Sequence, residues 1–141
     1  MDSSSQKKPV KVKVSAMILK VAEGLFDMGE TLEERKNLLK FACSAWNIAC
    51  FESPKRYEYL ERYIDKFREV NNPPEEACKD LREDMLQLME QKDKLYPNIT
   101  VRILISDISV EDGKEHVIVI STQFLGKCQQ QPAPDTHILI H

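Results

Sequence analysis

The chain changes its periodicity at Pro97, and this change limits the folds that it can adopt. Before this proline, apolar residues recur every three or four positions, which is typical of amphipathic helices. After it, the segments ITVRILISDISV and EHVIVIS are rich in β-branched residues, and the Asp112-Gly113 pair between them suits a type I′ turn. The sequence therefore predicts helices followed by a β-hairpin at residues 99–122.

Four helices are expected before Pro97. Thr31 and Glu34 have the spacing of a capping box, which predicts the start of the second helix. Short connections make the helices antiparallel neighbours. The expected fold class is α+β, a four-helix antiparallel bundle followed by a C-terminal β-hairpin in a small antiparallel sheet. The expected helices span residues 15–28, 32–51, 54–70 and 74–95.

The 141 residues favour one domain. Residues 1–9 are polar and aperiodic, which predicts a flexible arm, and residues 126–141 are expected to form a flexible Gln/Pro-rich tail with a short apolar end. The single α+β domain then spans residues 10–125. No apolar run approaches the 18 residues of a membrane span, and the N-terminal residues lack the pattern of a secretory signal, so a cytoplasmic protein without a membrane partner is expected.

The segment FACSAWNIACF, residues 41–51, predicts the central helix of the bundle. Three alanines at helical spacing, Ala42, Ala45 and Ala49, allow a neighbouring helix to approach closely. Cys43 and Cys50 are two turns apart, roughly 10 Å along the axis, so they cannot form a disulfide and are expected to pack in the core. The narrow polar side of this helix consists of Asn37, Lys40, Ser44 and Asn47.

Catalytic and metal-binding patterns are sparse. All three histidines lie in the last quarter of the chain, so no predicted helix supplies the Glu-x-x-His motif of a di-iron bundle. A weak metal site remains at Cys128, His137 and His141, which lack a fourth ligand. No glycine-rich phosphate loop or nucleophile motif occurs. We expect no enzyme activity and no cofactor, and a cysteine- or metal-dependent enzyme is the third choice.

The N-terminal arm is locally basic although the net charge of the chain is −3. Five lysines and one aspartate occur among the first twenty residues, and a basic arm attracts phosphate. The arm has no arginine or aromatic residue that could read or stack on bases. A nucleic-acid-associated regulator is therefore the runner-up, with nucleic acid not the expected partner. Its candidate contact residues are Lys7, Lys8, Lys11 and Lys13.

The hairpin carries more apolar side chains than one layer of helices can cover. Strand alternation predicts Ile103 and Ile105 on one face of the first strand, yet both strands also have apolar residues on the other face. Two strands alone are marginal and leave two open edges. A third strand could come from residues 10–14, from residues 138–140, or from another molecule, and we favour another molecule.

The leading functional hypothesis is a small non-enzymatic protein-interaction module. Its partner is another protein or a second copy of the chain, which would form a symmetric homodimer through the edge of the hairpin. The sequence does not identify the partner or the pathway. The residues predicted to bind the partner are Ile103, Ile105, Ile118 and Ile120.

Overall fold

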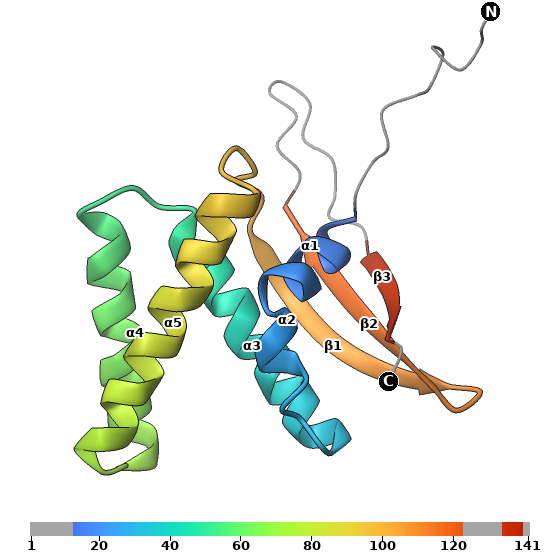
Figure 1. Ribbon diagram of the computed structural model, residues 1–141, viewed down its shortest axis with the longest axis horizontal. Helices are drawn as coiled ribbons and strands as arrows, with labels where there is room; N and C mark the ends of the chain where they lie inside the picture. The colour runs from blue at the N-terminus through green and yellow to red at the C-terminus, as the bar shows by residue number, and fades with distance from the viewer. Residues whose placement is uncertain (1–12, 123–133, 140–141) are drawn as a thin grey trace, which may run out of the picture.

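The protein is an α+β structure in which helices precede an antiparallel sheet, as the sequence predicts (Figure 1). The computed structural model describes residues 13–122 and the backbone of residues 134–139. The N-terminal arm and most of the C-terminal tail lie outside the described residues. The elements are α1 (Val14–Val21), α2 (Glu23–Phe26), α3 (Leu32–Ala49), α4 (Lys55–Asn71), α5 (Glu75–Leu95), β1 (Ile103–Glu111), β2 (Lys114–Ser121) and β3 (Pro134–Leu139).

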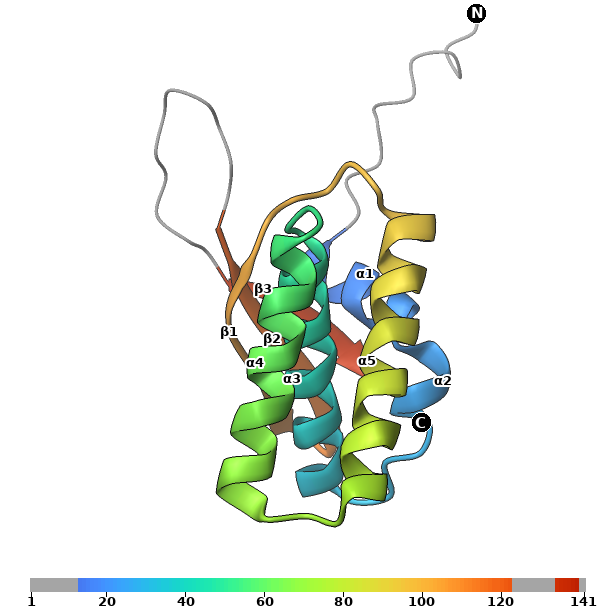
Figure 2. The same ribbon diagram turned by 90° about the vertical axis from the view of Figure 1, so that its left-hand side faces the viewer.

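The described helices lie on one side of the three-stranded sheet, whose order is β1-β2-β3 (Figures 1 and 2). α1 and α3 contact the sheet, α5 packs on both of them, and α4 packs on α5 and α3 farther from the strands. The inner face of the sheet therefore closes the core. No described helix covers its outer face.

The first predicted helix is divided in two. Residues 15–28 were expected to form one helix, but α1 ends at Val21 and the short α2 begins at Glu23. The divide falls at Ala22, which has backbone angles outside the helical range and is 1% exposed. Gly24 lies just beyond it, and glycine costs about 1 kcal/mol relative to alanine within a helix. The described residues therefore contain five helices, and the expected detail of a four-helix bundle is not confirmed.

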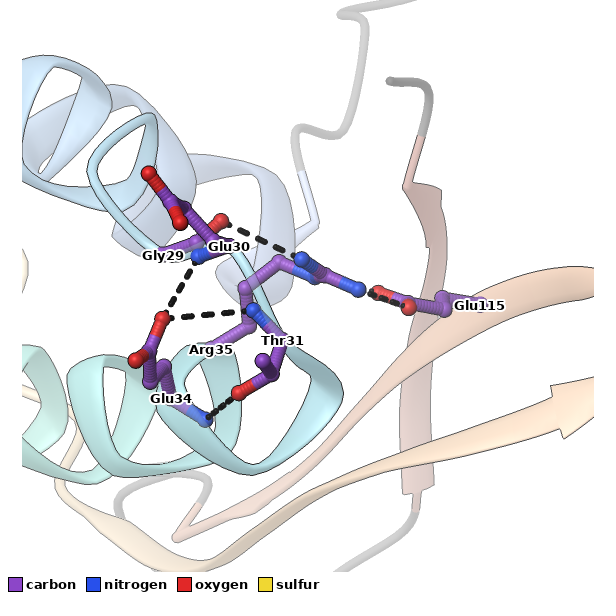
Figure 3. A network of polar contacts seen from close by, with 6 residues as sticks. All are labelled: Gly29, Glu30, Thr31, Glu34, Arg35 and Glu115. Carbon is purple, nitrogen blue, oxygen red and sulfur yellow. Dashed lines mark hydrogen bonds and ion pairs between the residues drawn. The ribbon is translucent and has the colours of Figure 1, made fainter.

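The capping box predicted at Thr31 is present and fixes the start of α3 (Figure 3). The Thr31 hydroxyl accepts from the Glu34 N–H at 3.1 Å, and the Glu34 carboxylate accepts from the Thr31 N–H at 3.2 Å. Arg35, one residue further on, donates to the Gly29 carbonyl and to the carboxylate of Glu115 on β2 (Figure 3). The turn before α3 is thereby tied to the sheet.

α3 is the central helix, because it contacts every other described helix and also packs on β1. Its alanine stripe is buried as expected: Ala42 and Ala45 are 1% exposed and Ala49 is 4% exposed. The only tryptophan, Trp46, is also 1% exposed. Small residues here allow close approach of α5, and the large indole fills the space beside that contact.

The predicted hairpin is confirmed, including its turn. Asp112 and Gly113 have φ angles of 54° and 75°, which are the positive values of a type I′ turn. A β-bulge lies between Ile103 and Ile105, where two residues of β1 advance against one of β2. It reverses the alternation of the strand, so Ile103 is 7% exposed in the core and Ile105 is 57% exposed. The expectation that both share one face was wrong.

The third strand comes from the chain itself. β3 pairs antiparallel with β2, in a register that aligns Ile138 with His116 and Thr136 with Ile118. The expectation of a flexible tail was therefore wrong for residues 134–139, where a β-branched and apolar stretch meets the open edge of β2. The alternative strand at residues 10–14 is contradicted at Val14, which begins α1. Residues 10–12 lie outside the described residues.

Candidate interaction surfaces

The outer face of the sheet carries an apolar patch. Along β2, Val117 and Val119 are completely buried against the helices, whereas Ile118 and Ile120, which alternate with them, point away and are half-buried. Ile105 lies directly opposite Ile120 in the β1–β2 register, so it shares this outer face. Ile105, Ile118 and Ile120 form what we call the outer apolar patch.

Three of the four residues predicted to bind a partner belong to this patch, and the fourth does not. Ile103 packs in the core because of the bulge, and both of its backbone polar groups bind Asn47. The Asn47 side chain donates to the Ile103 carbonyl at 2.9 Å and accepts from the Ile103 N–H at 2.7 Å. Ile103 is thus removed from the predicted set of partner-binding residues.

Side chains of the helices donate hydrogen bonds to the backbone of the extended segment that leads into β1. The carbonyl of Val101 accepts from the Trp46 indole N–H at 2.7 Å, and the carbonyl of Ile99 accepts from the Lys92 ammonium at 2.5 Å. With the Asn47 contact to Ile103, three alternate carbonyls are satisfied by α3 and α5 instead of by another strand. This part of the edge is closed to strand addition.

Lys92 is a buried lysine that the sequence patterns did not reveal. It is 2% exposed, and its Nζ lies 5.1 Å from the centre of the Trp46 ring, within the range of a cation–π contact. Burial lowers the pKa of Lys92. A lysine at a core position of α5 resembles any other lysine in the sequence. The hydrogen bond to the Ile99 carbonyl and the contact with the Trp46 ring explain why this lysine is buried.

The described cysteines behave as packing residues. Cys43 is 5% exposed, and burial raises the pKa of its thiol to about 11. Cys50 is half-buried, and burial also raises the pKa of its thiol, against the opposing effect of nearby Lys92. Cys78 on α5 is completely buried. All three carry free thiols.

The weak metal candidates are not brought together by what the structure describes. Cys128 and His141 lie outside the described residues, and His137 is placed in β3 opposite Val117. Within residues 13–122, no group of three histidine, cysteine or acidic side chains is arranged to hold a metal ion.

None of the described helices is long and apolar enough to cross a membrane.

Of the four lysines proposed for nucleic-acid contact, the structure describes one. Lys13 is the N-cap residue of α1 and is exposed, whereas Lys7, Lys8 and Lys11 lie outside the described residues. The basic arm therefore keeps the status of a prediction.

Comparisons of the chain with known protein families, with curated proteins and with solved structures found no match.

Proposed function

We propose that this protein is a non-enzymatic protein-interaction module that forms a symmetric homodimer through the outer apolar patch. The observation that carries this proposal is the exposure of Ile105, at 57%, on a sheet face that no described helix covers. Its neighbours Ile118 and Ile120 extend the apolar surface along β2. Apolar surface that is contiguous and uncovered typically marks an interaction site.

The contact differs from the pairing of hairpin edges that the sequence suggested. β3 occupies the free edge of β2, and helix side chains satisfy the beginning of the β1 edge. In the proposed dimer, the outer apolar patches of two copies instead meet face to face, related by a two-fold axis, so that the same isoleucines meet from both sides. Towards the turn, the outer face ends in Ser109 and His116, a polar rim that limits the contact to the patch.

The test is sedimentation velocity over a concentration series with three proteins. The wild type is expected to shift from monomer to dimer as its concentration rises. Ile105→Lys is expected to weaken association at least tenfold, because a lysine would be buried against its own copy across the axis. Val70→Lys is the matched control, since Val70 is 68% exposed on α4, away from the sheet.

Three results would count against the homodimer. A wild type that stays monomeric at every concentration would contradict it directly. Equal weakening by Val70→Lys would indicate non-specific association through surface charge. Dimerisation that Ile105→Lys leaves unchanged would place the interface elsewhere on the molecule. Circular dichroism of both variants verifies that they remain folded.

A further inference from the structure

Two neighbouring grooves run along the polar side of α3. One, of about 500 Å³, lies between α3 and the edge of β1, and its lining includes Lys40 from α3 and residues 103–106 from β1. The other, of about 360 Å³, lies between α3 and α4 and is bordered by Arg62 and Lys66. Both share Ser44 and Asn47, so they form one continuous surface. We call it the α3 groove.

The α3 groove is basic, although the chain as a whole is acidic. Lys40, Arg62 and Lys66 line it, and no aspartate or glutamate is among its lining residues. None of these three cations forms an ion pair with a carboxylate in the part of the chain that the structure describes. By contrast, the hollow between α1, α2 and α5 is lined by Glu23 and Glu90 among other acids. A ligand of the α3 groove is therefore expected to be anionic.

A stack of aromatic and guanidinium groups borders the groove. Phe51 and Tyr59 stack with ring centres 4.4 Å apart. Arg62 lies over the Tyr59 ring at 5.3 Å, and Arg102 lies over the Phe51 ring at 4.4 Å. Stacking restricts the guanidinium groups, so less side-chain entropy is lost when they bind a carboxylate.

The same stack argues against nucleic acid as the ligand. Proteins that bind single strands stack bases on exposed aromatic faces. Here Phe51 contacts both Tyr59 and Arg102, and Tyr59 contacts both Phe51 and Arg62, so neighbouring side chains already contact these rings. The groove offers positive charge without an aromatic platform for a base.

The backbone of β1 offers hydrogen bonds in the same place. Glu111 and Lys114 flank the two-residue turn as a hydrogen-bonded pair, so Ser106, five residues before Glu111, belongs to a non-hydrogen-bonded pair with Val119. Its N–H and C=O consequently point to the outer edge of the sheet, into the groove. Further along that edge, the Ile108 N–H is bound by the Asp107 carboxylate at 2.8 Å. The open stretch of edge is thus centred on Ser106.

We propose that the α3 groove binds an acidic peptide in an extended conformation. The peptide backbone pairs with β1 at Ser106, and its carboxylates contact Lys40, Arg62 and Lys66. An apolar side chain of the peptide packs on Leu104, which is 53% exposed. Strand addition at a sheet edge supplies affinity through the main chain, while the side-chain contacts supply specificity. Ile105 lines the α3 groove and also belongs to the outer apolar patch, so the two surfaces meet at this residue, whereas Ile118 and Ile120 do not line the groove. Peptide binding does not require the homodimer.

The test is fluorescence anisotropy with a labelled eight-residue peptide of alternating glutamate and valine. We expect saturable binding that weakens as salt is added, and no binding of the matching lysine–valine peptide. Lys40→Glu and Lys66→Glu are each expected to weaken binding at least tenfold. Lys79→Glu is the matched control, because Lys79 is an exposed lysine on α5 that does not line the groove.

Several outcomes would overturn the proposal. One is the absence of saturable binding to the acidic peptide by the folded wild type. Another is equal weakening by Lys79→Glu, which would show attraction by charge alone. Tighter binding of a single-stranded oligonucleotide that displaces the peptide would identify nucleic acid as the ligand. Ile118→Lys, which alters the outer apolar patch, is expected to leave the peptide affinity unchanged, so failure of the homodimer and failure of this site are distinguishable.

Discussion

Replacing Asn47 with alanine measures how strongly α3 holds the first strand. The substitution removes one donor and one acceptor, both of which bind the backbone of Ile103. Because Ile103 is only 7% exposed, water replaces only a small part of the hydrogen bonding that its N–H and C=O lose when the Asn47 side chain is removed. An unsatisfied buried polar group costs about 1–3 kcal/mol. Asn47 borders the α3 groove, so water reaches part of this space, and we take the lower half of that range for each group.

Two such groups cost about 2–4 kcal/mol, and the higher helix propensity of alanine offsets about 0.6 kcal/mol. We therefore expect Asn47→Ala to lower the free energy of unfolding by about 1.5–3.5 kcal/mol. The assay is urea unfolding followed by the fluorescence of Trp46, the only tryptophan. With an m-value of about 2 kcal/mol/M, the midpoint should fall by about 1 M.

Asn37→Ala is the matched control for this experiment. Asn37 lies on the same helix and is exposed, so its replacement gives the same gain in helix propensity without breaking a contact to β1. It should be as stable as the wild type or slightly more so. A loss of less than about 0.5 kcal/mol for Asn47→Ala, as for ordinary surface substitutions, would refute the assignment of Asn47 as the link between α3 and β1.

Two further predictions concern the core of α3. Ala45→Leu is expected to destabilise the protein by about 1–3 kcal/mol in the same urea assay, because Ala45 is 1% exposed and has no room for added methylenes. An unchanged midpoint would mean that this face is loosely packed. Cys43 should resist alkylation at pH 8, since a thiol with a pKa of about 11 is roughly one thousandth thiolate there. Its labelling, mapped by mass spectrometry, should accelerate as the pH rises towards 11 or on unfolding, and rapid modification of folded protein at pH 8 would contradict its burial.

Local signals in the sequence predicted the features that depend on neighbouring residues. The Thr31 capping box and the Asp112-Gly113 turn each involve a few consecutive positions, and both are present in the structure. The alanine stripe of α3 was predictable for the same reason, because helical spacing decides which residues share a face. These elements specify the helix-then-hairpin order without any information about long-range contacts.

Features that depend on long-range contacts were missed. The bulge between Ile103 and Ile105 leaves no mark on strand propensity, yet it decides which isoleucine is exposed. β3 follows a stretch rich in glutamine and proline, so composition predicted a flexible tail where the edge of β2 favours a strand. Lys92 was missed because its acceptor, the Ile99 carbonyl, is supplied by a segment outside its own helix.

The polar side of α3 binds the backbone at the beginning of β1, which helical spacing alone does not indicate. Helical spacing placed Asn47 on the polar side of the helix, but it did not indicate that this side lies beside a strand edge, where the Asn47 side chain binds backbone groups that another strand would otherwise bind. Trp46 and Lys92 do the same for Val101 and Ile99. Because these contacts end at Ile103, the next outward-facing backbone groups, at Ser106, are the first that a partner can use. In the proposed complex, the row of contacts that stabilises the sheet therefore also determines where the extended peptide adds to it.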